Sequence, residues 1–223
     1  MQHTQIIIPA IIPKSLDNLK DSLARVAPFA RSVQIDIVDG VFVPSISWPY
    51  QELGRIESLS PLIENFEVEM DLMVMNPEDV IETYLQSGVS RVVIHLESTN
   101  HFKAIVALKE KYNFLLGISI NNDTPLTKLA EYINDIEYVQ LMGIAQIGSQ
   151  GQPFDERVLE RISILKDTYP YLEISIDGSV NSDSLPRLLG AGATRFAVGS
   201  AIVGAEHPQE AYEVLTQMAG VFL

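Results

Sequence analysis

The chain has 223 residues, enough for one large or two small domains, and 47% of them are hydrophobic, so a sizeable core is available. A formal net charge of −14 argues against nucleic acid and membrane surfaces as partners, because both are negatively charged, and the absence of cysteine excludes disulfides and thiolate chemistry. The N-terminus lacks the basic start of a signal peptide and no apolar run reaches membrane-spanning length, so the sequence predicts a cytoplasmic protein.

Eight short apolar runs of strand length follow one another along the chain. They lack strict polar–apolar alternation, which is typical of strands that are buried on both faces. The runs cover residues 5–9, 33–38, 66–74, 91–96, 115–120, 136–142, 172–177 and 195–198.

Segments with helical periodicity lie between these strands. Apolar residues form one stripe over residues 15–26. The Asn-Pro pair at 76–77 and the Thr-Pro pair at 124–125 each place a capping residue before a proline, so we expect helices to start there. Amphipathic segments also cover residues 154–169 and 207–218, whereas the helices after the second and the seventh strand have weaker patterns.

Eight strand–helix units in a chain of this length predict an α/β fold, a single (β/α)8 TIM barrel over residues 1–223. A doubly wound open sheet is the structural alternative. We find no linker, low-complexity tract or change in composition, so we expect one domain.

Polar residues at the carboxyl ends of the strands are the first candidates for an active site, because barrels of this kind build their sites there. Carboxylates dominate this set, and a buried carboxylate is costly unless it is paired, metal-bound or catalytic. The candidates are Gln34, Asp36, Asp39, Asp71, His95, Asn121, Asn122, Asp123 and Asp177. Within this set, Asp39 is assigned to the turn after the second strand.

Asp36 and Asp177 form the most informative pair. The second and the seventh strand lie on opposite walls of an eight-stranded barrel, so two carboxylates there could move a proton from one face of a carbon to the other. Taken alone, Asp36 is also compatible with capping a loop, and Asp177 with a turn. Asp71 is equally compatible with a ligand and with a carboxylate held by backbone amides, and we interpret His95 as a pocket histidine with satisfied hydrogen bonds.

Three glycine-containing loops follow the last three predicted strands: "IGSQGQ", "DGS" and "VGS". Such loops expose backbone N–H groups, and barrels commonly bind a phosphate group after strands seven and eight. Three of them in succession predict a phosphate site. An anionic ligand would therefore be held by local amides, in spite of the overall charge.

The blocks "IIPAII", "VQIDIVDGVFVP", "DLMVMNP", "VVIHLES", "IDGSVN" and "AGATRFAVGSAI" resemble, in this order, those of the ribulose-phosphate 3-epimerase family. The resemblance implies a ribulose-phosphate-binding barrel that inverts C3 of a pentulose 5-phosphate through an enediolate, with two aspartates as acid and base around a divalent metal ion. By position these are Asp36 and Asp177. The resemblance places the phosphate site at Gly148, Gly151, Gly178, Ser179, Gly199 and Ser200.

The metal site departs from the family pattern. The family uses two histidines and the two aspartates, but Gln34 and Asp71 stand at the histidine positions. Ala10 also replaces a serine of the family, and Val41 replaces a histidine. A ligand set of Asp36, Asp177, Gln34 and Asp71 offers only oxygen atoms, which suits Mg²⁺ or Mn²⁺ better than Zn²⁺.

The sequence therefore predicts an isomerase that epimerises a ketose phosphate of the ribulose 5-phosphate/xylulose 5-phosphate type. A non-catalytic barrel that binds a sugar phosphate is the first alternative, because both metal-site histidines are replaced. A lyase of the same superfamily is the second, although Met73 stands where such enzymes place a lysine. The expected partner is a small sugar phosphate, and the family resemblance adds the expectation of a homo-oligomer.

Overall fold

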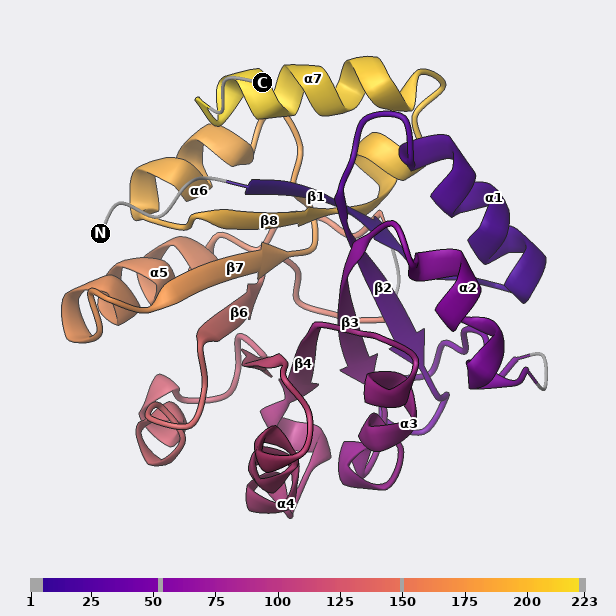
Figure 1. Cartoon of the computed structure of the whole chain (residues 1–223). Helices are drawn as coiled ribbons and strands as arrows, with labels where there is room; N and C mark the ends of the chain where they lie inside the picture. Colours follow the sequence, from indigo (N-terminus) through magenta and orange to yellow (C-terminus); the bar gives the residue numbers. More distant parts are fainter. Residues whose placement is uncertain (1–5, 52–53, 149–150, 221–223) are drawn as a thin grey trace.

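The computed structural model describes residues 6–51, 54–148 and 151–220, which form a closed barrel of eight parallel strands in chain order (Figure 1). Pairing of β1 with β8, from Ile6 opposite Arg195 to Pro9 opposite Val198, closes the barrel. The predicted barrel is confirmed, and the open sheet is wrong because it would leave these two strands as unpaired edges. The strands are β1 (Ile6–Ile11), β2 (Ser32–Val38), β3 (Glu67–Met73), β4 (Arg91–His95), β5 (Leu115–Ile120), β6 (Tyr138–Met142), β7 (Glu173–Asp177) and β8 (Arg195–Val198). Gln5, in the first predicted strand, lies outside the described residues.

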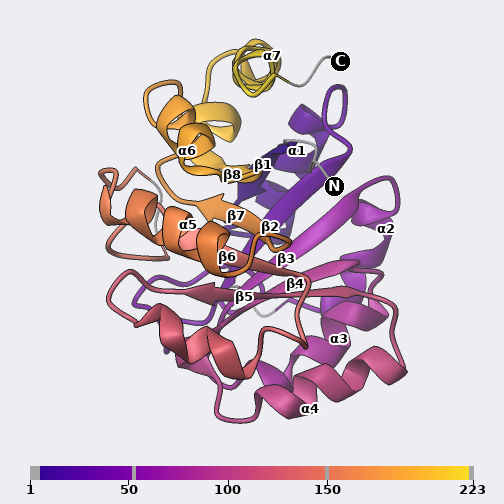
Figure 2. The same cartoon turned by 90° about the vertical axis from the view of Figure 1, so that its left-hand side faces the viewer.

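Helices surround the barrel and cover its outer face (Figures 1 and 2). The α-helices are α1 (Leu16–Val26), α2 (Ser60–Ile63), α3 (Ile81–Gln86), α4 (Phe102–Ala107), α5 (Arg157–Thr168), α6 (Leu185–Ala191) and α7 (Pro208–Met218). Short 3₁₀ helices are η1 (Ile56–Ser58), η2 (Pro77–Asp79), η3 (Leu96–Ser98), η4 (Leu108–Glu110) and η5 (Leu126–Glu131). The segment η6 (Gly199–Val203) is a short π-helix.

The first helix forms as its apolar stripe predicts. The hydroxyl of Ser15 accepts a hydrogen bond from the backbone N–H of Asn18 at 3.1 Å and so caps the start of α1. Leu19, Leu23 and Val26 are buried on the face that packs against the barrel. The cap and the stripe together fix both the start and the orientation of this helix.

The two predicted Asn/Thr-Pro helix starts are only partly right. Asn76 adopts a left-handed conformation (φ 53°) and makes no side-chain cap, so a short 3₁₀ turn precedes α3. Thr124 donates its hydroxyl to Glu97 at 2.5 Å instead of capping, and the segment after it forms only the 3₁₀ turn η5. At Thr124 a contact with a distant residue, which the local pattern does not contain, replaced the expected cap.

Strand residues alternate between the helix layer and the barrel interior. On β2, Val33, Ile35 and Ile37 belong to the main hydrophobic cluster together with residues of the helices. Gln34 and Asp36, between them, are buried and hydrogen-bonded to each other inside the barrel. The strands look continuously apolar in the sequence, but the residues of β2 that point into the barrel are polar and include candidate site residues.

A buried ion-pair network fills the amino-terminal end of the barrel interior. Glu69 accepts hydrogen bonds from Arg91 at 2.8 Å and from Arg195 at 3.2 Å. Arg91 also pairs with Glu173 at 2.5 Å, and its guanidinium lies 4.1 Å from the ring centroid of Tyr138. Each charge therefore has a partner, which offsets the cost of removing it from water.

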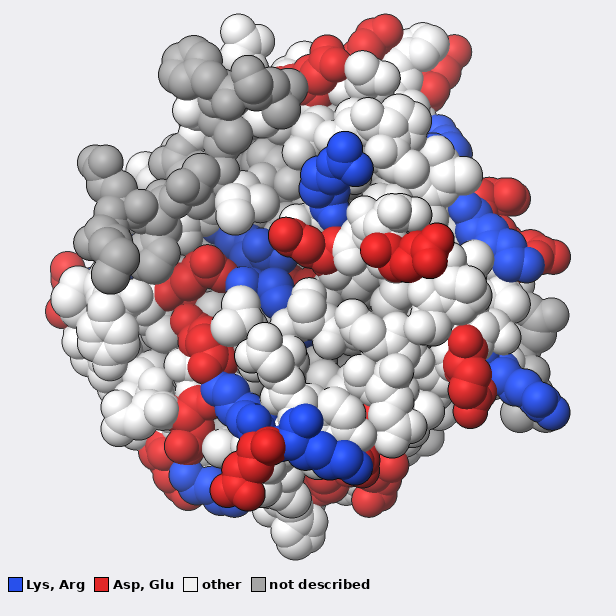
Figure 3. Space-filling model, in the orientation of Figure 1, with Lys and Arg blue, Asp and Glu red and all other residues white. Residues whose placement is uncertain are grey.

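Acidic and basic side chains are interspersed on the face seen in Figure 3, so this face is not uniformly negative. Among the described residues, no helix is both long enough and apolar enough to cross a membrane.

Replacing Glu69 by glutamine should lower the free energy of unfolding by about 3 kcal/mol, because it leaves Arg195 and part of Arg91 without a buried counter-charge. Urea unfolding followed by circular dichroism measures this loss. Glu67→Gln is the matched control, since Glu67 lies exposed at the start of the same strand and its replacement should change stability by less than about 0.5 kcal/mol. Equal losses in both variants would contradict a stabilising role for the network.

Candidate active site

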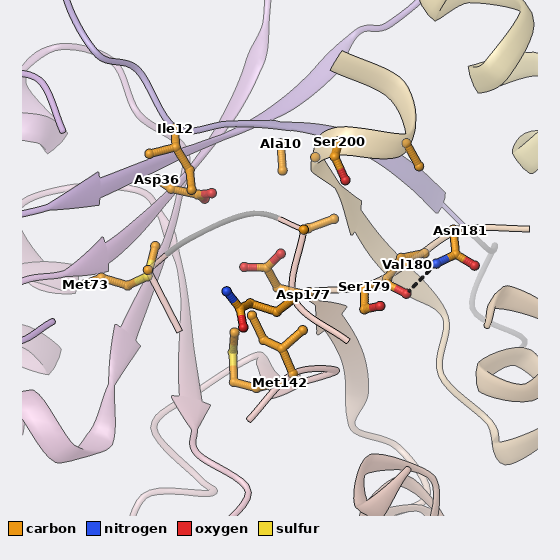
Figure 4. A pocket seen from close by; sticks show the side chains of 18 residues that line it. Ala10, Ile12, Asp36, Met73, Met142, Asp177, Ser179, Val180, Asn181 and Ser200 are labelled. Carbon is orange, nitrogen blue, oxygen red and sulfur yellow. Dashed lines mark hydrogen bonds between the residues drawn. The ribbon is translucent and has the colours of Figure 1, made fainter. Parts of the chain in front are cut away.

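Three carboxylates from three strands meet at the carboxyl end of the barrel. Oxygen atoms of Asp36 on β2, Asp71 on β3 and Asp177 on β7 all lie within 4.8 Å of one another. Asp36 and Asp71 are opposite each other in the pairing of β2 with β3. Figure 4 shows Asp36 and Asp177 projecting into one pocket from different parts of its wall. The structure thus brings together the three aspartates that the sequence singled out, and their number and distance suit one cation.

Gln34 contacts one of these carboxylates. It is completely buried, and its Nε2 donates a hydrogen bond to Asp36 Oδ1 at 2.8 Å. Its Oε1 has no hydrogen-bond partner among the described residues. Gln34 is therefore part of the site, with its amide nitrogen facing Asp36.

Asp71 is held by two further buried side chains. His95 Nε2 donates to Asp71 Oδ1 at 3.1 Å, and Gln140 Nε2 donates to Asp71 Oδ2 at 2.8 Å. The interpretation of His95 as a satisfied pocket histidine is half right, since its Nδ1 has no partner among the described residues. Side chains, and not the backbone amides considered as the alternative, hold Asp71.

Sequence reasoning missed Gln140. It lies in the apolar run "YVQLM" of β6, as Gln34 lies in that of β2. The signal was available, because a lone amide inside a buried strand must find a hydrogen-bond partner. What the sequence lacked was the identity of that partner, which lies 69 residues away along the chain.

Burial and mutual repulsion raise the pKa values of the acid pair. The pKa of Asp36 lies well above 3.8 because burial disfavours its charge and because Asp177 and Asp71 add repulsion. The pKa of Asp177 is raised to about 7, chiefly by burial and by the Asp71 charge, although the Gly178 N–H, His95 and Gln34 partly offset this. Near neutral pH, one member of such a pair can hold a proton while the other is ionised, as acid–base catalysis requires.

The pKa of His95 is also raised above 6.5. Burial lowers it, but the neighbouring Asp71 carboxylate and their hydrogen bond favour the charged imidazolium more strongly. The positive charge of His95 can therefore compensate part of the negative charge that the three aspartates bring together.

A cavity of about 270 Å³ opens above the aspartates. Its wall is apolar where Ile12, Met73, Met142 and Ile144 line it, and Asp36 and Asp177 reach into it from the barrel (Figure 4). Among the described lining residues there is no lysine or arginine. Backbone N–H groups and neutral side chains must therefore hold any anionic group that enters.

The predicted phosphate loops form one side of this cavity. Gly148, Gly151, Gly178, Ser179, Gly199 and Ser200 all line it, and Figure 4 shows Ser179 and Ser200 on the same side. Gln150, in the "IGSQGQ" loop, lies outside the described residues. The three loops meet in space as their succession along the sequence predicted.

Ser179 is held in a left-handed conformation (φ 54°) that serine rarely adopts. Its carbonyl oxygen accepts hydrogen bonds from Ser184 Oγ at 2.7 Å and from Asn181 Nδ2 at 3.2 Å. Figure 4 shows the bond from Asn181. These bonds fix the loop and leave the Ser179 side chain at the cavity wall. Backbone strain of this kind is concentrated at functional sites.

The loops after β2 and β6 contact each other beside the cavity. Ser45 donates its hydroxyl to the carbonyl oxygen of Gly148. A Cβ atom at Gly148 would lie only 2.6 Å from Val43, so glycine is needed for this close approach. Asp39, which the sequence assigned to a turn, accepts hydrogen bonds from the backbone N–H groups of Val41 at 2.8 Å and Phe42 at 2.9 Å.

The chain matches the sequence model of a family described as the ribulose-phosphate 3 epimerase family over residues 6–203. It is 31% identical over 175 residues to a ribulose-phosphate 3-epimerase of Aquifex aeolicus, an alignment that covers 77% of each chain. It is 28% identical to the cytoplasmic isoform of ribulose-phosphate 3-epimerase of Oryza sativa, with 94% of this chain and 92% of that protein covered.

Solved structures resemble the fold at lower identity. A crystal structure of KGPDC from Streptococcus mutans superposes with a TM-score of 0.73 at 14% identity, covering 98% of both chains. A 3-hexulose-6-phosphate synthase gives a TM-score of 0.73 at 17% identity, covering 97% of this chain and 99% of that one. At these identities the likeness concerns the barrel fold alone.

The raised pKa of Asp177 predicts a specific dependence of stability on pH. Between pH 4 and 7 the folded protein keeps a proton that the unfolded chain has lost, so the free energy of unfolding should fall as the pH rises through this window. One such proton contributes a slope of up to about 1.4 kcal/mol per pH unit. Urea unfolding in chelator at pH 5, 6 and 7 measures the slope.

The slope should be smaller in Asp177→Asn, because asparagine does not titrate. Asp183→Asn is the matched control, since Asp183 is an exposed carboxylate a few residues further along the same loop, and this variant should keep the wild-type slope. An unchanged slope in Asp177→Asn would contradict the assignment of the raised pKa to Asp177.

Proposed function

Because this chain belongs to the ribulose-phosphate 3-epimerase family and is therefore an isomerase, we propose that it inverts the carbon next to the carbonyl group of a ketose phosphate. The proposed substrate is of the ribulose 5-phosphate/xylulose 5-phosphate type. Asp36 and Asp177 are the proposed acid and base. The observation that carries the proposal is the meeting of these two carboxylates, both with raised pKa values, beside a cavity lined by the phosphate loops.

The proposed reaction follows from the positions of the two acids. The ionised carboxylate removes the proton from the carbon next to the carbonyl group, and the carbonyl oxygen takes up negative charge as an enediolate forms. The protonated carboxyl group then delivers a proton to the opposite face of the same carbon. One proton is lost and one is gained, so the configuration inverts without a change in composition.

The phosphate group of the substrate fits the loops after β6, β7 and β8. Gly148, Gly151, Gly178 and Gly199 offer backbone N–H groups, and Ser179 and Ser200 offer hydroxyl groups. This donor set can bind a dianion without a cationic side chain. Anchoring the phosphate there would bring the carbonyl end of a short sugar toward the two aspartates and the apolar wall.

A divalent metal ion fits the residues of this site. Three carboxylates have oxygen atoms within 4.8 Å of one another, and Gln34 Oε1 is buried without a partner among the described residues. Asp36, Asp177 and Asp71 would hold the ion, with Gln34 as a fourth ligand if its amide turns over. These oxygen ligands favour Mg²⁺ or Mn²⁺ over Zn²⁺. When bound, the ion would stabilise the negative charge of the enediolate oxygens.

Asp177→Asn should lower the rate of solvent deuterium exchange into ribulose 5-phosphate at least about 100-fold, because it removes one proton-transfer group. Binding of inorganic phosphate, measured by calorimetry, should change little, since the loops stay in place. Asp183→Asn should behave as wild type in both assays. Wild-type protein that binds the sugar phosphate but catalyses no exchange, with any of Mg²⁺, Mn²⁺ and Zn²⁺, would favour a non-catalytic binding protein.

Protein purified in the presence of Mg²⁺ or Mn²⁺ should contain about one ion per chain by elemental analysis, and chelator should lower the exchange rate. Asp71→Asn should weaken Mn²⁺ binding at least about tenfold, because the number of charged ligands sets the affinity of such sites. A metal-free protein that exchanges at the full rate in chelator would overturn the metal proposal and leave the acid–base proposal standing.

A further inference from the structure

The loop after β6 differs from the loop after β7 in how it is held in place. It carries two of the glycines proposed to bind the phosphate group, Gly148 and Gly151, and both line the cavity. The loop after β7 is fixed by its own residues, because Ser184 and Asn181 bond the carbonyl oxygen of Ser179. The loop after β6, in contrast, accepts hydrogen bonds from side chains of two other loops, those after β2 and β5.

Asn122, in the loop after β5, contacts both ends of the β6 loop. Its Nδ2 donates a hydrogen bond to the carbonyl oxygen of Met142 at 2.9 Å, where β6 ends, and lies 3.4 Å from that of Ile144. The same nitrogen donates to Asp155 Oδ2 at 3.0 Å, shortly before α5 begins. The backbone N–H of Asp155 in turn donates to the carbonyl oxygen of Gly143 at 2.8 Å. One side chain thus joins the start of the loop to its end.

The turn that carries Asn122 is itself fixed from two sides. Arg161 on α5 donates hydrogen bonds to the backbone carbonyl oxygens of Asn121 and Asn122, each at 3.2 Å. Glu97, which follows β4, accepts hydrogen bonds from the backbone N–H of Asn121 at 2.9 Å and from the hydroxyl of Thr124 at 2.5 Å. The amide of Asn122 is therefore a fixed point to which the β6 loop is bonded.

The start of the β6 loop lies directly against the proposed phosphate site. A Cβ atom at Gly143 would lie only 2.1 Å from the carbonyl oxygen of Gly178, in the loop after β7. Met142 and Ile144, whose carbonyl oxygens face Asn122, also line the cavity (Figure 4 labels Met142). A displacement of this segment would therefore change the shape of the cavity and the relative positions of two of the three loops.

We propose that Asn122 is a positioning residue that holds the β6 loop in the conformation that binds the phosphate group. This inference rests on the proposed function for the identity of the bound group. Asn122 does not line the described cavity, so it acts through the backbone that it holds. Because the described cavity lining has no lysine or arginine, affinity depends on N–H groups that already point at the anion, and ordering them upon binding would cost free energy.

Asn122→Leu keeps the approximate size of the side chain and removes its donor. It should raise the Kd of inorganic phosphate, measured by calorimetry, at least about fivefold, because the net contribution of one hydrogen bond changes an equilibrium by about this factor. The KM of ribulose 5-phosphate should rise by a similar factor. The kcat should change less than about twofold, because the loop binds substrate and transition state alike and the two aspartates lie on strands.

This division between KM and kcat separates positioning from a merely structural role. A structural role would lower the Tm of Asn122→Leu and leave the Kd of phosphate and the KM at their wild-type values well below the Tm. That result would overturn the proposal, and so would a loss confined to kcat.

Thr124→Val is the matched control. It also removes a side-chain hydrogen bond from the turn after β5, but that bond goes to Glu97 and does not reach the β6 loop. The Kd of phosphate should therefore stay close to the wild-type value. If Thr124→Val weakens phosphate binding as much as Asn122→Leu does, the effect belongs to the turn as a whole and the proposal fails.

Hydrogen exchange followed by NMR tests the inference without phosphate or turnover. The amide hydrogen of Asp155 should exchange at least about fivefold faster in Asn122→Leu than in wild-type protein, because the two ends of the loop separate more often. The amide hydrogen of Asn181, which is bonded to Ser184 Oγ in the loop after β7, should exchange at the wild-type rate. An unchanged rate at Asp155 would overturn the proposal.

The two kinds of measurement keep this inference distinct from the proposed function. Wild-type protein that binds no phosphate and catalyses no deuterium exchange into ribulose 5-phosphate would count against the proposed function. Faster amide exchange at Asp155 in Asn122→Leu would then still support the role of Asn122 in holding the loop. Phosphate binding and turnover in wild-type protein, with unchanged amide exchange in the variant, would support the proposed function and overturn the role of Asn122.

Discussion

The repulsion among three buried carboxylates is the constraint on which the site depends. Asp36, Asp71 and Asp177 come from three strands of the barrel and lie within 4.8 Å of one another. Buried hydrogen-bond donors lie beside two of them: Gln34 bonds Asp36, and His95 and Gln140 bond Asp71. The barrel buries the carboxylates and holds them together, and burial and repulsion raise the pKa of Asp177 into the range that proton transfer at neutral pH requires.

The two ends of the barrel interior differ in how far their buried charges are compensated. At the amino-terminal end, Glu69 and Glu173 are matched by Arg91 and Arg195, so that end is a closed, compensated layer. At the carboxyl end the negative charges exceed the positive ones, and one hydrogen-bonding atom of Gln34 has no partner among the described residues. The carboxyl end thus keeps an excess of negative charge, which suits the binding of a cation.

The loops proposed to bind the phosphate group face a second electrostatic constraint. The chain carries a net charge of −14, and the described cavity lining has no lysine or arginine. Local backbone N–H groups and neutral side chains, among them the hydroxyls of Ser179 and Ser200, are the donors available to an anion. Ser179 has a strained, left-handed backbone conformation. Hydrogen bonds from Ser184 and Asn181 to its carbonyl oxygen stabilise this conformation and so keep the loop in position.

The sequence by itself determined the barrel, the pairing of Asp36 with Asp177 and the succession of glycine loops, because strand periodicity and the order of motifs are properties of the chain. It could not determine which donors would hold Asp71, or that the amide of Gln34 would bond Asp36. It also mispredicted the start at Thr124, whose hydroxyl bonds Glu97 across the fold. Only the tertiary structure decided these points, because each depends on an atom that the closing of the barrel brings from a distant strand or loop.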